Sequence, residues 1–450
     1  MRRRTLLSAG IAAGAVTTLA ACAPGSDQPQ QSAPAPSASD VSTDIASLGA
    51  ITLKVWDQEV RGPQDEAITA LIAAFKTKYP NVTIDRVKQS FDDLKKQTAL
   101  ALSGNDVPDV LQVNNARADM GEFVKAGQLT DLSGYAAAYK WTDRFGASVL
   151  SKARYSTDGV TFGDGSLWGL PQTGEIVGIF YSAKKLAALG VQAPKTWDEL
   201  TDALTKAQAA GEQPLVLGNL EKWPALHVFG PLQGRYVASD EIIKLGMGNK
   251  GASWTSAENL EALTALGDMA KDKWLGPSPN GLSYDAAWPE FTKGTGVMLI
   301  GGSWLAGDMG KVMGDDLHFM APPAGKDGKV ATTGGTGIPF AIPAKAKQPA
   351  AAAAYIDFIT SADAMKIIAE KGGMPVLNTA ELAPASGVNK EVYAAFDEVS
   401  TNGVLLPYLD YATPTFSDTA GNTLQELIGG QKNAQQAADA LQKDYAEFTK

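Results

Sequence analysis

Aromatic, amide and carboxylate side chains are the residues in this sequence that could carry chemistry. Trp56, Asp57 and Glu59 lie where the first apolar, β-branched run ends, and Asn114 and Asn115 follow the third such run. A sugar ring offers an apolar C–H face to an aromatic ring and a rim of hydroxyls to carboxylates and amides. Because open α/β sheets bind ligands at the carboxyl ends of their strands, these positions suit a sugar site.

The nine tryptophans favour two different interpretations. Trp304 follows two glycines and a serine after an apolar run, and Trp223 follows a short polar turn. A tryptophan in such a turn can present its ring to a ligand, so both are expected to contact sugar. Trp141, Trp197 and Trp274 are expected to be half-buried packing residues.

Several other chemistries are excluded by composition. With two histidines, His227 and His318, and one cysteine, the sequence predicts no zinc site, no Cys–His nucleophile and no disulfide framework. A G-x-G-x-x-G match at residues 246–251 follows a helical segment rather than a strand, and neither a Walker A sequence nor a G-x-S-x-G elbow occurs. The net charge of −10 disfavours nucleic acid. We therefore expect no metal, no cofactor and no nucleic-acid partner.

The N-terminus indicates export. A basic start and an apolar run over residues 6–19 precede Leu-Ala-Ala-Cys, which resembles the lipobox of bacterial lipoproteins, in which lipid is attached to the cysteine, here Cys22. The sequence predicts a signal peptide over residues 1–21 and, from its Ala/Pro/Ser/Gln content, a flexible linker over residues 22–49. Consecutive arginines leave the twin-arginine and general secretory routes both open. We expect the folded body at the extracellular face of a bacterial cytoplasmic membrane, held there by the lipid alone.

The body begins with alternating strand and helix patterns. Residues 51–56, 82–87 and 110–113 read as strands. Pro63 suits the first helical position of a segment that runs to Tyr79, and Asp92 or Asp93 can cap a helix that runs to Leu102. The order β-α-β-α-β predicts a parallel sheet covered by helices. At 450 residues the chain exceeds the usual size of one core, which favours two lobes.

The same alternation continues to the C-terminus. Thr196 and Glu199 form a capping-box pattern that opens a helix to Ala210, and Ser256 and Ser361 suit the caps of two later helices. Further strands are expected over residues 176–181, 296–300 and 338–342, and further helices over residues 184–189, 257–271, 350–359 and 362–371, followed by a final amphipathic helix from about residue 434.

Several motifs, in a fixed order, resemble one protein family. Residues 164–171 (DGSLWGLP), 178–186 (GIFYSAKKL) and 194–200 (PKTWDEL) resemble the central signature of extracellular solute-binding proteins, family 1, that serve carbohydrate ABC importers. Weaker matches follow the same order, at residues 104–110, 296–304, 334–342 and 373–376. The resemblance covers residues 50–450 and extends to maltodextrin-binding proteins.

The resemblance implies a fold and a mechanism. The family has the α/β, two-lobed periplasmic-binding-protein-like (type II) fold, in which each lobe is a mainly parallel sheet flanked by helices and several chain crossings form the hinge. The N-terminal lobe is expected to comprise residues 50–172 and 334–372, and the C-terminal lobe residues 173–333 and 373–450. Ligand is held between the lobes, which close on it and present it to a permease. The implied protein is a monomeric, non-enzymatic binder of a sugar, more specifically an oligosaccharide.

The resemblance also implies site residues. Trp304 is similar to a stacking tryptophan of the maltodextrin-binding proteins, Trp223 to a stacking tyrosine, and Glu175 and Glu221 to sugar-binding carboxylates. Two departures disfavour a long maltodextrin: only Arg117 supplies charge near Asn114 and Asn115, and Ala306 stands in place of a second aromatic residue. The loop at residues 406–411 resembles a cleft loop of actinobacterial members. The complete expected ligand site is Trp56, Asp57, Glu59, Asn114, Asn115, Gln172, Glu175, Glu221, Trp223, Gly302, Trp304, Gly335, Met374, Asp410 and Tyr411.

Two rival functions remain open. Paired carboxylates among Asp57, Glu175, Glu221 and Asp410 could serve as the acid and base of a secreted glycosidase. The same groups occur in sugar-binding sites as hydrogen-bond acceptors, and the expected tether favours binding. A phosphorylated polyol or another non-sugar solute is the second alternative, although phosphate would require clustered Arg or Lys.

Overall fold

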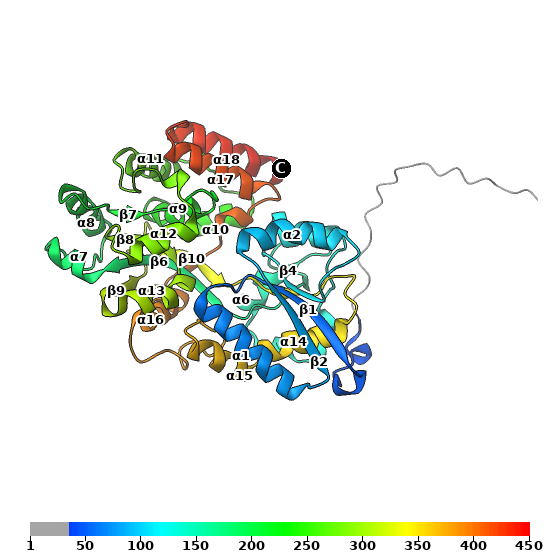
Figure 1. Cartoon of the computed structure of the whole chain (residues 1–450). Coiled ribbons are helices and arrows are strands. Elements are labelled where there is room, and N and C mark those ends of the chain that lie inside the picture. The colour runs from blue at the N-terminus through cyan, green and yellow to red at the C-terminus, as the bar shows by residue number, and fades with distance from the viewer. Residues whose placement is uncertain (1–35) are drawn as a thin grey trace, which may run out of the picture.

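The computed structural model describes residues 36–450, which form two lobes joined by several chain crossings (Figure 1). Residues 1–35, which include the expected signal peptide and Cys22, lie outside the described residues. Each lobe has its own sheet, and helices cover both faces of it. The expected two-lobed α/β class is confirmed.

The N-lobe sheet has the strand order β11-β3-β1-β2. Strand β1 is parallel to β2 and to β3, whereas β11 runs antiparallel to β3 at the edge. Apolar and polar residues alternate in β1, and Ile51, Leu53 and Val55 are buried on its core side. The strands are β1 Ile51–Asp57, β2 Val82–Lys88, β3 Val110–Gln112 and β11 Phe340–Ala341.

Helices α1 (Gly62–Lys78) and α2 (Phe91–Ser103) cover opposite faces of this sheet (Figure 1). The chain steps from β1 outward to β2 and then back past β1 to β3, so two right-handed crossovers place the two helices on different faces. Pro63 stands in the first turn of α1, as expected. The other N-lobe elements are η3 Arg117–Gly121, α3 Glu122–Lys125, α4 Ser133–Ala138, α5 Trp141–Arg144, α6 Ala147–Leu150, β4 Arg154–Tyr155, β5 Ser166–Leu167, α14 Pro349–Ile359 and α15 Ala362–Glu370.

The C-lobe sheet has six strands, built around the long strand β6 (Gly174–Ser182). Strand β6 runs antiparallel to β8, β9 and β10, while the pairs β7–β8 and β10–β12 are parallel. The mainly parallel character expected of both lobes therefore describes the N-lobe sheet, and the C-lobe sheet is mixed. The remaining strands are β7 Leu215–Val216, β8 Met298–Gly302, β9 Leu317–Met320, β10 Ala331–Thr336 and β12 Val404–Leu406.

Helices pack on both faces of the C-lobe sheet and form two separate apolar clusters with it. One cluster includes Phe229, Trp254 and Phe416, and the other includes Phe180, Phe291 and Phe319. The helices are α7 Ala183–Ala188, α8 Trp197–Ala209, α9 Pro224–Tyr236, α10 Ser239–Gly246, α11 Ala257–Lys271, α12 Tyr284–Thr292, α13 Ala306–Met313, α16 Val388–Thr401, α17 Phe416–Ile428 and α18 Ala434–Phe448.

The chain crosses between the lobes near residues 171–174, 337–340 and 371–375. An antiparallel β-bridge between Leu170 and Phe340 joins the first two crossings on the N-lobe side. A second antiparallel β-bridge, between Thr173 and Pro375, joins the first crossing to the third. Strand β10 stays in the C-lobe sheet through Thr336, so the expected boundary between residues 333 and 334 falls inside this strand. For the same reason the strand expected over residues 338–342 is shorter and starts at Phe340.

Helix caps follow the local sequence closely. The capping box of Thr196 and Glu199 is present, and Ser256 and Ser361 cap their helices as expected. Helix α2 differs, because its cap is Ser90, whose hydroxyl accepts from the backbone N–H of Asp93 at 3.1 Å. Asp92 and Asp93, which were expected to cap this helix, instead lie in its first turn. Their negative charges interact favourably there with the positive end of the helix dipole.

Residues 36–49 differ from the expected flexible linker, since they pack on the N-lobe. Ile45 is fully buried in the N-lobe core. The side-chain amide of Asn81 donates to the carbonyls of Ile45 and Gly49 at 3.0 and 2.9 Å. The burial of Ile45 and the two hydrogen bonds from Asn81 attach this otherwise polar segment to the N-lobe.

Candidate functional site

A cavity lies between the two lobes. It encloses about 710 Å³ of space free of atoms, part of which opens to solvent. Strand ends, helix starts and the hinge all contribute to it, so both lobes line the same space. The lining residues are Gln58, Arg61, Phe91, Asn114, Asn115, Glu175, Trp223, Leu226, His227, Trp304, Thr336, Ile338, Tyr408, Asp410 and Tyr411.

Aromatic rings form a continuous wall that runs along the cavity from the C-lobe to the edge of the N-lobe core. His227 lies between Trp223 and Trp304, with ring centroids 5.1 and 5.4 Å away. Tyr408 continues the row at 5.8 Å from His227, and Tyr411 follows 5.4 Å further on. Such a wall offers π faces to the apolar side of a ring-shaped ligand.

The position of Trp304 depends on Gly302. Strand β8 ends at Gly302, and the chain turns back so that the Trp304 ring lies over this glycine. A Cβ atom there would lie 2.1 Å from the ring. The indole Nε1 donates to the hydroxyl of Tyr284 at 2.7 Å, which fixes the orientation of the ring. The backbone N–H of Tyr284 in turn donates to Oε2 of Glu221 at 2.9 Å.

Three carboxyl groups lie at or behind the cavity wall: Glu59 is buried, and Glu175 and Asp410 are half-buried. Burial, and after it the negative charge of Glu59, raise the pKa of Glu175 to about 7. Burial likewise raises the pKa of Glu59 to about 7, although a hydrogen bond from Gln112 opposes this shift. Burial raises the pKa of Asp410 to about 6 against the opposing charge of Lys95. These groups thus exchange protons close to neutral pH.

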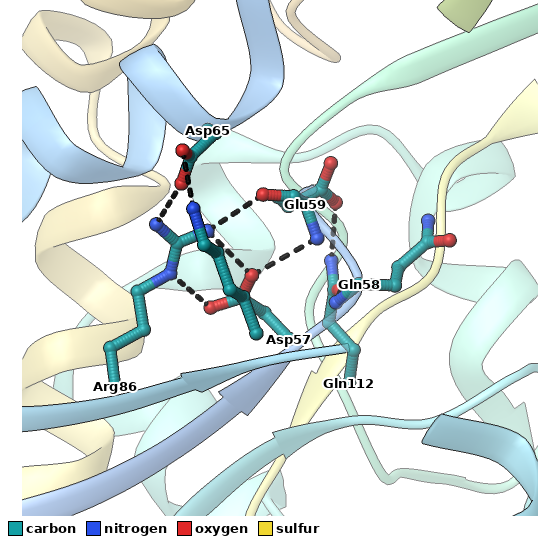
Figure 2. Close-up of polar contacts among 7 residues, drawn as sticks. Asp57, Gln58, Glu59, Asp65, Arg86 and Gln112 are labelled. Atoms are coloured by element: carbon teal, nitrogen blue, oxygen red, sulfur yellow. Dashed lines mark hydrogen bonds and ion pairs between the residues drawn. The ribbon is translucent and has the colours of Figure 1, made fainter. Parts of the chain in front are cut away.

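Asp57 belongs to a buried ion-pair network beneath the cavity (Figure 2). Its carboxylate accepts two hydrogen bonds from Arg86, at 2.6 and 2.7 Å, and Arg86 also contacts Asp65 at 2.6 Å. The same network holds Glu59, whose backbone N–H donates to Asp57 at 3.0 Å and whose carbonyl accepts from Arg86 at 2.8 Å. The network therefore positions the loop that carries Gln58 and Arg61 into the cavity.

Four buried polar atoms in the cavity wall lack a hydrogen-bond partner within the described part of the chain, and two of them are Nε of Arg61 and Nε1 of Trp223. The other two, Nδ1 of His227 and Oγ1 of Thr336, belong to residues that are only 6 % exposed. Burial lowers the pKa of His227 to about 3, so its ring is neutral at physiological pH. Buried polar atoms are normally paired, so these two are available to a ligand.

Comparison with known proteins decides the family. The model for bacterial extracellular solute-binding proteins matches residues 61–366. The chain belongs to this family. It is an extracellular solute-binding protein and not an enzyme, as expected from the sequence.

Curated relatives of this solute-binding protein are identical to it at about a quarter of the aligned positions. The multiple sugar-binding protein of Streptococcus mutans is 23 % identical over 339 residues, which cover 72 % of this chain and 75 % of the relative. The maltooligosaccharide ABC transporter solute-binding lipoprotein of Streptococcus pneumoniae is 25 % identical over 347 residues, or 75 % of each chain.

Solved structures support the fold. The solute receptor AcbH has a TM-score of 0.77 at 18 % identity, covering 89 % of this chain and all of the other. A chitin oligosaccharide binding protein has a TM-score of 0.74 at 21 % identity, covering 88 % of this chain and 98 % of the other. At these identities the similarity establishes the two-lobed architecture alone.

The solute-binding protein brings about half of the expected site residues to the cavity. Asn114 and Asn115 line the N-lobe wall, but both are tied up by the protein: Asn114 donates to Asp119 at 2.8 Å, and Asn115 donates to the carbonyl of Lys152 at 2.7 Å. The other expected residues that line the cavity are Glu175, Trp223, Trp304, Asp410 and Tyr411.

The remaining expected residues serve the fold around the cavity. Trp56 packs against the N-lobe core, and Met374 is buried in a C-lobe cluster. Gln172 donates to the carbonyl of Ile359 at 2.8 Å, which ties the first hinge crossing to α14. Gly335 pairs with Glu175 between β10 and β6 at φ +137°, a backbone conformation that favours glycine. Asp57, Glu59, Glu221 and Gly302 act from behind the wall, as described above.

Eight lining residues lie outside the expected set: Gln58, Arg61, Phe91, Leu226, His227, Thr336, Ile338 and Tyr408. Trp56 was expected in the site because it lies where a strand ends at the carboxyl edge of the sheet. The same reasoning applies to Gln58, which follows β1, and to Phe91, which begins the helix after β2. His227, by contrast, lies within an apolar helix and has the sequence context of a core residue. No sequence signal distinguishes a core histidine from a ligand-contacting histidine at this position.

Two further findings concern residues 36–450. Nowhere in this part of the chain do three or more His, Cys, Asp or Glu side chains come together as a metal site would require. None of the helices formed by these residues has the length and apolar character needed to span a bilayer.

Proposed function

We propose that this protein captures a saccharide between its lobes and delivers it to the permease of an ABC importer. The observation that carries the proposal is the aromatic wall of Trp223, His227 and Trp304 beside the carboxyl groups of Glu175 and Asp410. Stacked rings with hydrogen-bond acceptors suit the two faces of a sugar. The named activities of the curated relatives, multiple sugars and maltooligosaccharides, support the same class of ligand.

Capture requires that ligand favours the closed arrangement of the lobes. Glu175 and Thr336 lie on hinge-proximal ends of β6 and β10, whereas Phe91 comes from the N-lobe and Trp304 from the C-lobe. A ligand that contacts all four is bound best when the lobes are closed. It therefore shifts the population toward that state by its difference in affinity.

The cavity suits binding better than glycoside hydrolysis. Hydrolysis requires two carboxyl groups that reach opposite sides of one glycosidic bond. Of the four carboxylates considered for a hydrolase, Asp57 and Glu221 do not line the cavity. Glu175 and Asp410 do, but Glu175 already accepts a hydrogen bond from the hydroxyl of Tyr408 at 3.2 Å. A phosphorylated solute is also disfavoured, because Arg61 is the only cation among the lining residues and its guanidinium already contacts Asp285 at 2.8 Å.

A paired assay tests the proposal. Purified protein without residues 1–21 is heated with a panel of mono- and oligosaccharides, and the same mixtures are analysed for new reducing ends. We expect a raised melting temperature with at least one sugar and no released reducing ends. New reducing ends would support the hydrolase, and a panel without any thermal shift would contradict sugar binding.

We also propose that lipid on Cys22 holds the protein at the cell surface. We propose that the anchored protein is a monomer. The lipobox-like residues lie outside the described part of the structure, and the proposal is supported by lipoprotein relatives. Replacement Cys22→Ser should release the protein into the medium or stall its processing. Retention of the Cys22→Ser protein in the membrane fraction would contradict the anchor.

A further inference from the structure

Carboxyl groups outnumber cations among the residues that line the cavity. Glu175 and Asp410 are the acids, and Arg61 is the cation. The Arg61 guanidinium is already paired across the cleft with Asp285, at 2.8 Å. His227 adds no positive charge, because burial holds its pKa at about 3 and its ring stays neutral. The described part of the chain therefore gives this lining two carboxyl groups and no second cation.

The carboxylate of Glu175 contacts a phenol rather than a cation. Its Oε2 accepts a hydrogen bond from the hydroxyl of Tyr408 at 3.2 Å. Burial and the negative charge of Glu59 raise the pKa of Glu175, and the Tyr408 hydroxyl and the charge of Arg61 oppose this shift only in part. The side chain is half-buried and lines the cavity, so a ligand can reach its carboxyl group.

Asp410 shares a nearby cation, Lys95, with a second acid. Burial raises the pKa of Asp410 to about 6 against the positive charge of Lys95. The Lys95 ammonium, however, lies 3.4 Å from the carboxylate of Asp119, whose negative charge raises the pKa of Asp410 further. Asp410 is half-buried in the cavity wall, and its charge, like that of Glu175, is only partly compensated by the protein.

Five aromatic rings line the same cavity and also favour a positive charge. They belong to Phe91, Trp223, Trp304, Tyr408 and Tyr411. The π face of an aromatic ring is negative, so it attracts a cation that lies over it. Buried carboxylates are normally paired with a positive charge. The rings and the carboxyl groups of this cavity therefore call for the same kind of partner, a ligand that carries a positive charge.

We propose that the cleft binds a saccharide with a protonated amino group, and that Glu175 and Asp410 supply the negative charge that selects it. The proposal rests on the proposed function and narrows its ligand class to amino sugars. The ring carbons of an amino sugar stack on the aromatic wall as those of any sugar do, and its ammonium group adds the positive charge that the lining lacks. The net charge of −10 attracts the same ligand over longer distances.

Other polar groups of the lining fit the remaining hydroxyls of the same ligand. Nδ1 of His227 and Oγ1 of Thr336 have no hydrogen-bond partner in residues 36–450, and both residues are 6 % exposed. A neutral imidazole and a hydroxyl group bind sugar hydroxyls without adding charge. A neutral or N-acetylated sugar satisfies these groups equally well but leaves both carboxylates without a counter-ion. The amino group is therefore the feature that distinguishes the proposed ligand.

Sets of sugars that differ in one substituent test the proposal. The probes are glucose, glucosamine and N-acetylglucosamine, the corresponding galactose and mannose sets, and the disaccharides cellobiose, glucosamine dimer and diacetylchitobiose, measured by calorimetry at pH 7. In the set that binds best, we expect the amine to bind about tenfold or more tightly than both neutral members. A neutral member that binds as tightly as its amine overturns the charge selection and leaves sugar binding intact. Absence of binding to every probe counts against sugar binding itself.

Variants of both acids identify the groups responsible. Glu175→Gln and Asp410→Asn remove the negative charge and keep the size of the side chain, so each should lower the ratio of amine to neutral affinity by about threefold or more. The control is Asp397→Asn, which changes an exposed carboxylate on α16 and should leave the ratio unchanged. Circular dichroism and melting of the variants verify folding. An unchanged ratio in folded Glu175→Gln and Asp410→Asn shows that these carboxyl groups do not select the ligand.

Discussion

At the scale of single residues, the ligand wall depends on side chains that never touch the cavity. Trp304 is held by the absence of a side chain at Gly302 and by the hydroxyl of Tyr284. Gln58 is presented by a network in which the buried carboxylate of Asp57 pairs with the half-buried guanidinium of Arg86. The sequence therefore identified the segments that form the cavity, but several of the expected residues support the lining side chains and do not line the cavity themselves.

Trp304→Ala should weaken sugar binding by about 1–3 kcal/mol, because one desolvated aromatic anchor is lost. The ring lines the cavity and packs only on the edge of the cluster that includes Phe180, so the melting temperature without ligand should fall no more than in Trp274→Ala. Calorimetry and thermal melting measure the two effects. As a control, Trp274→Ala removes a tryptophan that packs on the C-lobe core, and it should lower stability without changing affinity. An unaltered dissociation constant in Trp304→Ala would remove this residue from the site.

Gly302→Ala should also weaken binding, although alanine adds only a methyl group. Its Cβ would lie 2.1 Å from the Trp304 ring, so the ring must leave its position over the strand end. We expect an affinity loss comparable to that of Trp304→Ala, and calorimetry with the same sugar measures it. Gly294→Ala provides a comparison with nothing within 4 Å of the added Cβ, although its φ of +100° adds backbone strain. Equal affinity of Gly302→Ala and wild type would show that the ring tolerates the methyl group.

At the scale of elements, local signals identified most strands and helices, whereas pairing between distant segments did not follow from sequence. The helix over 257–271 begins after Ser256 as expected, because its cap is a contact within four residues. Strand β6 was expected near residues 176–181, but its antiparallel pairing with three strands depends on segments over 100 residues away. The composition of residues 36–49 likewise gave no sign that Ile45 would enter the N-lobe core.

Thr196→Ala should cost about 1 kcal/mol of unfolding free energy, because it removes the cap of α8. The Thr196 hydroxyl accepts from the backbone N–H of Glu199 at 3.2 Å, and the Glu199 carboxylate accepts from the N–H of Thr196 in return. Urea denaturation measures the loss. The matched control, Thr205→Ala, lies within the same helix and removes only a hydroxyl bonded to the Thr201 carbonyl, so we expect a change of a few tenths of a kcal/mol. An equal effect of both variants would contradict the role of the cap.

At the scale of the whole molecule, the site lies between lobes that each contribute a carboxyl group with a raised pKa. Glu59 comes from the N-lobe and Glu175 from β6 at the hinge. Burial raises the pKa of both carboxyl groups, and the negative charge of Glu59 raises the pKa of Glu175 further. Because both pKa values lie near 7, the empty protein favours the protonated forms below neutral pH. A ligand that donates a hydroxyl hydrogen to Glu175, the one of the two that lines the cavity, instead favours its ionised form, which accepts more strongly. Stability and affinity should therefore depend on pH in opposite directions.

The stability of the empty protein should fall as pH rises from about 4.5 to 7. In the unfolded chain the two glutamates lose their protons near pH 4.5, while in the folded protein they keep them until about pH 7. Between these values the folded state binds more protons than the unfolded state, so raising the pH lowers the free energy of unfolding. Below pH 4.5 the stabilising contribution of the two glutamates is fully present. Melting temperatures of the ligand-free protein at pH 5 and pH 8 measure this difference.

Glu175→Gln isolates the effect of this pair on ligand binding. Glutamine keeps the size and the acceptor oxygen but does not titrate, so the increase in sugar affinity that we expect in wild type between pH 5 and pH 8 should shrink, and the loss of stability over the same range should be smaller. The control, Glu258→Gln, changes an exposed carboxylate on α11 and should preserve both slopes. His227 does not contribute over this range, because burial holds its pKa at about 3. If Glu175→Gln retained the wild-type pH dependence of both affinity and melting temperature, proton uptake at the hinge carboxyls would not link closure to ligand binding.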